Sequence, residues 1–279
     1  MNSIIKPVPT DYNTYLFYIE ELIRDFPFLN AEIQGRTAVG RGIFSLSLGN
    51  RKNAVLIAGG FCGSEIMTVN MLLLFTESLC RCVKYARQLW GVDVKRALSQ
   101  LGITLIPCVN PDGCEIHIKG FEGAKSLRHY AALRAAESGF TDGNAMGVDL
   151  KKNFFAAEAY ERSIAGQHRI SEAETKTLSR LCKSRDFRSC LSLECGDKLL
   201  LRHGNRPQSV MMAKILADSC GCTYRDSHNN EGLSRWFSES LHKPAFTLKA
   251  DKGCSPLPAQ SLYYNYARLE EALLLFCLM

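Results

Sequence analysis

The chain has 279 residues, of which 46% are hydrophobic and 22% are charged, so it holds enough apolar material for an ordinary globular core. Its formal net charge is +6, but lysines and arginines alternate with acidic residues along the chain. Nucleic-acid-binding proteins usually concentrate their basic residues. We therefore expect no nucleic-acid partner.

The sequence shows no export signal, and no run approaches the roughly 18 apolar residues that a membrane span requires. We therefore expect a cytoplasmic location, no membrane partner and reduced thiols for the 12 cysteines. The pairs Cys80/Cys82 and Cys220/Cys222 have neither CxxC spacing nor a histidine placed as in a zinc ribbon. We interpret them as structural thiols.

Hydrophobic periodicity predicts alternating helices and strands in the first half of the chain. The predicted helices cover 11–26 and 64–90, and the predicted strands cover 31–39, 42–49, 53–60 and 102–108. The first helix belongs to an N-terminal helix and leader over 1–28. The strand at 102–108 stops at "VNPDG", which is a turn signal of Pro, Asp and Gly.

The second half continues this alternation. Strands are predicted over 187–195, 198–203 and 244–250, and helices over about 122–137, 171–184, 207–220, near 233–241 and from about 261. Residues 223–232 are predicted to form a loop. The pattern indicates one α/β domain over 1–279, with a mixed, largely parallel twisted sheet and helices on both faces.

Polar side chains lie at or just beyond the carboxyl ends of several predicted strands. They are Cys62, Asn110, Glu194 and Lys249. Ligands of open α/β sheets bind in a crevice outside the carboxyl ends of the strands. We therefore expect these four residues to line one crevice.

Five motifs are similar to those of one enzyme family. "IAGGFCGSE" is similar to its "GGxHGxE", "PCVNPDG" contains its "NPDG", and "NAMGVDLKKNF" is similar to "NxxGVDLNRNF". "SEAETKTL" is similar to "SEPET", and "EGLSRWF" with "PAFTLKADKGCSPLP" is similar to "GGxxDWF" followed by "PxxTxExGxxxNPLP". Because they keep this order over about 200 residues, the chain resembles the zinc carboxypeptidase superfamily. It is most similar to the bacterial branch that cleaves γ-D-glutamyl–diaminopimelate bonds in peptidoglycan peptides.

The resemblance implies a zinc ion held by two histidines and a glutamate, with a second glutamate as general base. Carried over residue by residue, the first metal histidine falls on Cys62, while the metal glutamate is retained as Glu65. The second metal histidine falls on Glu194, and the general base falls on Lys249. Only one of these four positions keeps the family's residue.

The substrate-binding positions also differ from the family. The Asn and Arg of "NRN" fall on Lys151 and Lys152, and Asn110 of "NPDG" is a third candidate for binding substrate. The basic residue that usually precedes "NxxGVDLN" falls on Asp142. These lysines make an anionic peptide a plausible ligand, with Arg206 as a further contributor.

Aromatic and histidine side chains give weaker signals. The family's loop tyrosine falls near Ser227, although Tyr224 and His228 lie close by. The remaining histidines match no ligand position of the family, and we assign no role to His117, His129, His203 and His242.

Lys249 argues most strongly against hydrolysis. A lysine beside carboxylates stays cationic, so it cannot take a proton from water. We expect its ammonium to lie between Glu65 and Glu194 in place of the metal. The sequence thus favours a pseudo-peptidase that has lost zinc-dependent hydrolysis, binds zinc weakly or not at all, and still binds a peptide, a cell-wall fragment or a protein partner.

Three alternatives stay open. Cys62, Glu65 and Glu194 could hold zinc in an altered site that hydrolyses peptide or amide bonds. Cys62 could be a nucleophile, although no histidine is placed to activate it. The same residues could also be structural, with Cys62 as a buried thiol, Glu65 as a helix cap, and Lys249 paired with Glu194.

Overall fold

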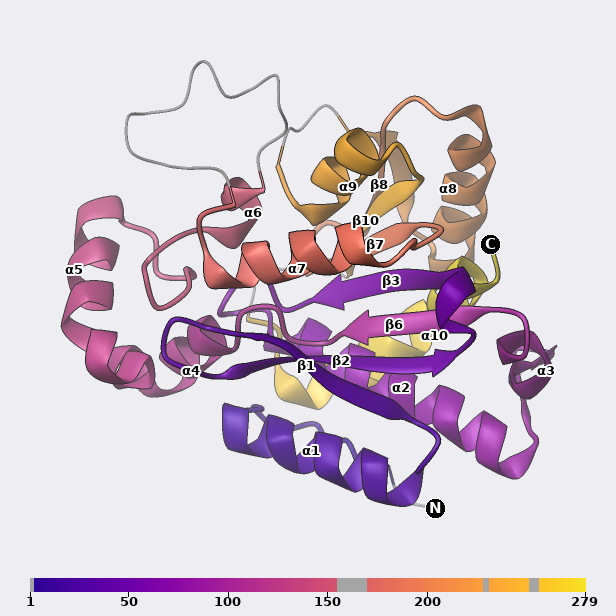
Figure 1. Ribbon diagram of the computed structural model, residues 1–279, viewed down its shortest axis with the longest axis horizontal. Coiled ribbons are helices and arrows are strands. Elements are labelled where there is room, and N and C mark those ends of the chain that lie inside the picture. Colours follow the sequence, from indigo (N-terminus) through magenta and orange to yellow (C-terminus); the bar gives the residue numbers. More distant parts are fainter. Residues whose placement is uncertain (1–2, 155–169, 228–230, 251–255) are drawn as a thin grey trace.

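A twisted sheet of eight strands lies at the centre of the fold (Figure 1). This computed structural model describes residues 3–154, 170–227, 231–250 and 256–279. The sheet strands are Asn30–Arg36 (β1), Gly42–Gly49 (β2), Ala54–Gly59 (β3), Gly102–Ile106 (β6), Cys190–Cys195 (β7), Leu199–His203 (β8), Thr223–Asp226 (β9) and Ala245–Ala250 (β10). A separate hairpin consists of Gln88–Leu89 (β4) and Val92–Asp93 (β5).

The strand order is β1-β2-β6-β3-β7-β10-β8-β9. Four of the seven neighbouring pairs are parallel, namely β3 with β6, β3 with β7, β7 with β10, and β8 with β9. The remaining three pairs are antiparallel. This arrangement confirms the predicted mixed sheet.

Helices cover both faces of the sheet. One face packs against Tyr12–Asp25 (α1), Ile66–Tyr85 (α2), Pro207–Cys220 (α8) and Leu262–Leu278 (α10). The other face packs against Ala173–Ser184 (α7) and Leu233–Leu241 (α9). The remaining helices are Val94–Leu98 (α3), Pro111–Lys119 (α4), Arg128–Ser138 (α5) and Leu150–Asn153 (α6), with 3-10 turns at Arg51–Asn53, Gly120–Leu127 and Ala259–Ser261.

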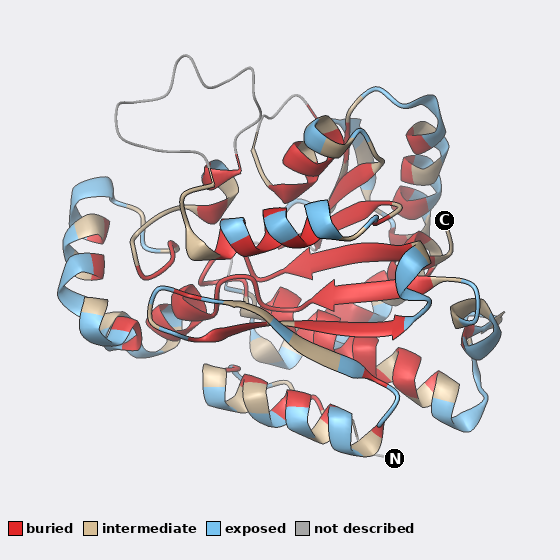
Figure 2. Ribbon diagram, viewed as in Figure 1, coloured by how far each residue is buried: buried red, intermediate tan, exposed pale blue. Residues whose placement is uncertain are grey.

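The central strand β3 is buried along its whole length (Figure 2). Val55 and Ile57 contribute to the core on the α2 side, whereas Leu56 and Ala58 contribute to the core under α7 and α9. A strand covered on both faces needs a continuous apolar run, which is the pattern of "AVLIAG". Among the described residues, α2 is the one helix long and apolar enough to span a membrane, and 78% of its apolar window is buried inside the fold.

Several elements differ from the sequence predictions, among them α4, α2 and β9. The "NPDG" turn begins helix α4, because the Asn110 side chain accepts a hydrogen bond from the Gly113 N–H at 2.8 Å and Pro111 fits the first helical turn. Helix α2 ends at Tyr85, where Ala86 adopts a left-handed conformation (φ 50°), and not at residue 90. Strand β9, predicted as a loop, is a largely exposed edge strand, so it lacks an apolar alternation.

Candidate functional site

The turn after β3 carries Cys62 and Glu65 in a closely packed loop. Gly60 has φ +64°, and a Cβ there would lie 2.7 Å from the Val69 side chain, so the position requires glycine. Asp142 fixes the next part of the loop, since its carboxylate accepts hydrogen bonds from the Ser64 N–H at 3.1 Å and the Ser64 hydroxyl at 2.9 Å. The position where the family has a basic residue therefore anchors this loop.

The short helix α6 carries Lys151 to the same place. The Asp149 carboxylate accepts from the backbone N–H groups of Lys151 and Lys152 and so caps α6. Asn153 then ties the end of α6 to α7, because its Oδ1 accepts from the Thr175 hydroxyl at 2.6 Å. These polar contacts position Lys151 from both sides.

Lys151 lies between two buried carboxylates. Its Nζ is 3.3 Å from Oε1 of Glu65 and 3.5 Å from Oε2 of Glu194. The side chains of Glu65 and Glu194 are 3% and 9% exposed, and that of Lys151 is 25% exposed. Burial alone would lower the pKa of Lys151, but the Glu194 and Glu65 carboxylates raise it above its ordinary value. The ammonium therefore stays charged.

Glu65 makes two further contacts within the site. Its Oε2 accepts from the Cys62 N–H at 3.2 Å, and its Oε1 accepts from the Cys195 N–H at 3.5 Å. Burial and the neighbouring Glu194 raise the pKa of Glu65, whereas Lys151 lowers it. Although Glu65 stands at the N-cap of α2, its side chain makes no cap hydrogen bond. The alternative in which Glu65 is a capping side chain therefore has no hydrogen bond to support it.

Lys249 does not lie between Glu65 and Glu194, where the sequence predicts it. Lys249 pairs in register with Glu194 across β10 and β7, yet within the described part of the chain it makes no ion pair with Glu65 or Glu194. Lys151 occupies that point instead, because α6 approaches the strand ends from outside the sheet (Figure 1). The Lys249 side chain lines a neighbouring cavity.

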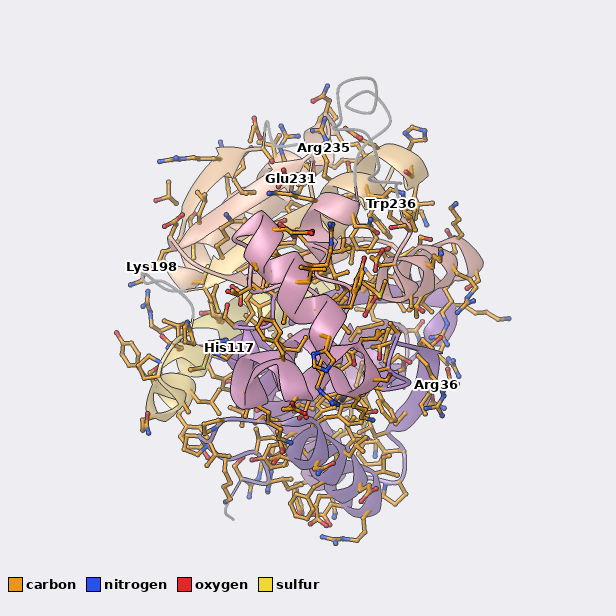
Figure 3. The ribbon with its side chains drawn as sticks, turned by 90° about the vertical axis from the view of Figure 1, so that its left-hand side faces the viewer. Arg36, His117, Lys198, Glu231, Arg235 and Trp236 are labelled. Atoms are coloured by element: carbon orange, nitrogen blue, oxygen red, sulfur yellow. The ribbon has the colours of Figure 1, made fainter. Side chains whose placement is uncertain are left out.

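This cavity has a volume of about 120 Å³. It is lined by Lys151, Glu194, Leu201, His203, Ser227, Glu231, Gly232, Thr247 and Lys249. Figure 3 labels Glu231, Arg235 and Trp236 in the upper part of the molecule. The cavity thus lies directly beside the Lys151 ion pairs and contains a second lysine.

His203 also lines this cavity, although the sequence assigns it no role. Its side chain is buried, and its Nε2 lies 2.9 Å from the Thr247 hydroxyl. Burial lowers its pKa to about 3, helped by Arg235, so the imidazole is neutral. Its Nδ1 has no hydrogen-bond partner among the described residues. No motif marks this position, since His203 reaches the cavity only through the antiparallel pairing of β8 with β10.

Other predicted site residues lie elsewhere. Asn110 is fully buried and donates to the Phe61 carbonyl at 3.0 Å, so it supports the loop from below. Lys152 is 54% exposed, lies 3.9 Å from Asp149 and does not line the cavity. Ser227 lines the cavity, as its place near the family's tyrosine suggested.

The remaining candidates for the tyrosine position are placed as follows. The hydroxyl of Tyr224 donates to Asp226 at 2.6 Å and accepts from Arg202, away from the cavity lining. His228 lies outside the described residues.

The donor set around Lys151 does not fit a zinc ion as it is arranged. An ammonium stands where Glu65 and Glu194 would meet a metal. Burial and the Glu65 carboxylate raise the pKa of Cys62, so beside the Lys151 ammonium its thiol is protonated. Over the described ranges, no group of three or more His, Cys, Asp or Glu residues is arranged to hold a metal.

Comparison with known proteins identifies the family. The family profile described as "Zinc carboxypeptidase" matches residues 15–255. "Uncharacterized protein YqgT" of Bacillus subtilis is 26% identical over 269 residues, which cover 89% of this chain and 72% of that protein. "Gamma-D-glutamyl-L-diamino acid endopeptidase 1" of Lysinibacillus sphaericus is 23% identical over 283 residues, which cover 95% and 71% of the two chains.

Solved structures share the fold. Bovine thrombin-activatable fibrinolysis inhibitor, in complex with tick carboxypeptidase inhibitor, superposes with a TM-score of 0.74 at 15% identity over 97% of both chains. Murein-tripeptide amidase MpaA of Escherichia coli superposes with a TM-score of 0.56 at 20% identity, covering 87% of this chain and 91% of its own. Since the family profile spans most of the sequence, the chain belongs to the zinc carboxypeptidase family.

Proposed function

We propose that this chain is a pseudo-peptidase of the zinc carboxypeptidase family, in which a lysine ammonium takes the place of the metal. The observation that carries this proposal is the pair of ion contacts from Lys151 Nζ to Glu65 and Glu194. Zinc hydrolysis needs an open metal position for water and a base that can take a proton. Lys151 takes the place of the metal, so no such position exists, and Lys249 stands in the place of the base.

The cavity beside Lys151 is the proposed ligand site. Lys249 has no ion-pair partner among the described residues, and the neutral His203 offers an unused nitrogen. A ligand with an acidic group would satisfy Lys249 without displacing Lys151. Because relatives include a gamma-D-glutamyl-L-diamino acid endopeptidase and a murein-tripeptide amidase, we propose a peptide or a cell-wall peptide fragment as the ligand. A cytoplasmic location remains a prediction from the sequence.

The alternative function is an active metallopeptidase with zinc on Cys62, Glu65 and Glu194. It is supported by the fact that Glu65 and Glu194 contact the same lysine, and that Cys62 also raises the pKa of this lysine. It requires Lys151 to leave this point and Cys62 to lose its proton. A Cys62 nucleophile is less favourable, because burial raises the pKa of its thiol.

The test is incubation of the protein with a γ-D-glutamyl–diaminopimelyl peptide, with and without added zinc, followed by chromatography of the peptide. We expect intact peptide and saturable binding that weakens when Lys249 is changed to methionine. A Lys152→Met variant is the matched control, because its lysine lies outside the cavity. Zinc-dependent cleavage that disappears in Cys62→Ala would establish the alternative.

A further inference from the structure

Cys220 and Cys222 flank a turn at the end of α8. Gly221 between them has φ 63° and ψ 33°, which is the left-handed helical conformation. The distance between the flanking Cα atoms depends only on these two angles, and helical geometry of either hand gives about 5.4 Å. Disulfide-bonded cysteines have Cα atoms roughly 4.4–6.8 Å apart. The separation of the two Cα atoms across this turn therefore lies within the range that a disulfide spans.

The two thiols have different surroundings. Cys220 is 5% exposed, and its Sγ donates to the Leu216 carbonyl at 3.1 Å, as a protonated thiol does. Cys222 is half-buried, and its neighbour Thr223 donates its N–H to the Lys198 carbonyl at 2.9 Å, which brings Lys198 alongside. The neighbouring Cys220 thiol lowers the pKa of Cys222, and Arg268 and Lys198 lower it further against the effect of burial.

The turn is also open to small molecules. A Cβ added at Gly221 would meet no atom within 4 Å, so the turn borders open space. Figure 3 shows Lys198 at the rim of the molecule. The pair Cys108 and Cys114 offers a contrast, because its sulfurs lie 3.8 Å apart but both residues are at most 5% exposed. The sulfurs of Cys108 and Cys114 are therefore close together, but small molecules in solvent do not reach them.

We propose that Cys220 and Cys222 form a redox-active thiol pair, which low-molecular-weight disulfides oxidise to an intramolecular disulfide. The Cys222 thiolate attacks one sulfur of the small disulfide, whose S–S bond breaks and whose second sulfur leaves as a thiolate that takes a proton from water. Cys220 then loses its proton to water and attacks Sγ of Cys222, which releases the second small thiol. Two protein thiols are thus oxidised, and one small disulfide is reduced to two thiols.

The test uses the folded wild-type protein and oxidised glutathione as the probe. After incubation, free thiols are alkylated and the protein is digested with trypsin. Cleavage after Lys214 and Arg225 yields residues 215–225, which hold Cys220 and Cys222 as their only cysteines. Cleavage after Arg96 and Lys119 yields residues 97–119, which hold Cys108 and Cys114.

We expect the 215–225 peptide to lose the mass of two hydrogen atoms and to resist alkylation, and dithiothreitol to reverse both changes. The 97–119 peptide is expected to stay fully alkylated after unfolding. The Cys220→Ser variant is expected to accumulate a glutathione adduct on Cys222. In Cys222→Ser, the remaining Cys220 thiol is expected to react with oxidised glutathione at least about tenfold more slowly than the wild-type pair does. A persistent adduct in the wild type, or a disulfide in 97–119 while 215–225 stays reduced, would overturn the proposal.

Discussion

Replacing Lys151 with methionine removes the ammonium from the site while keeping a side chain of similar length. The variant leaves the carboxylates of Glu65 and Glu194 buried and without a counter-charge. Removing one partner of a buried ion pair costs about 3–5 kcal/mol. Because the Lys151 side chain keeps 25% of its exposure, we expect the lower end of this range, a loss of about 3 kcal/mol in the free energy of unfolding.

Urea unfolding followed by circular dichroism at pH 7.5 and pH 5 measures this loss. It should shrink at pH 5, because protonation of one carboxylate relieves their repulsion. Lys152→Met is the control, since that lysine is 54% exposed and 3.9 Å from Asp149, and it should cost less than about 0.5 kcal/mol. If Lys151→Met also changes stability by less than about 0.5 kcal/mol at pH 7.5, then the lysine does not replace a metal.

Three further predictions concern the surroundings of the site. Burial raises the pKa of Glu174 from 4.5 to about 7, and the Asp112 carboxylate also raises it. Between pH 4.5 and about 7, the folded state therefore keeps a proton on Glu174 that the unfolded state releases. Stability should therefore fall by up to about 3 kcal/mol as pH rises from about 4.5 to about 7, and urea midpoints of Glu174→Gln should lack this fall. Asp142→Ala removes the two hydrogen bonds to Ser64 and should cost about 1–3 kcal/mol by the same assay, whereas an unchanged midpoint would mean that these two bonds do not stabilise the loop. Changing Cys62 and Glu194 to histidine and Lys249 to glutamate should restore zinc binding fully only when Lys151→Asn is added, and equal zinc content with and without that fourth change would contradict the role of Lys151.

Much of the fold could be predicted from local patterns. The continuous apolar run of β3 and the helical stripe of α2 each depend on burial, which leaves a periodic record in the sequence. Strand β9 leaves none, because it is an edge strand with few buried side chains. The order of the motifs identified the family, and Glu65 and Glu194 both contact one ammonium, that of Lys151.

The identity of that ammonium could not be predicted. Lys249 was the natural choice, since it stands beside Glu194 on the neighbouring strand. Which lysine reaches the carboxylates depends on how α6 packs over the strand ends, and α6 is only four residues long. His203 was missed for a similar reason, because its contact with Thr247 follows from strand pairing and not from sequence spacing.

The central claim is that the Lys151 ammonium stands in the place of the zinc ion. The most direct test is the zinc content of the wild-type protein after incubation with excess zinc at neutral pH and removal of free metal by gel filtration. We predict far less than one zinc per chain, and no change in that value for Cys62→Ala. One tightly bound zinc per chain in the wild type, lost in Cys62→Ala, would contradict the claim.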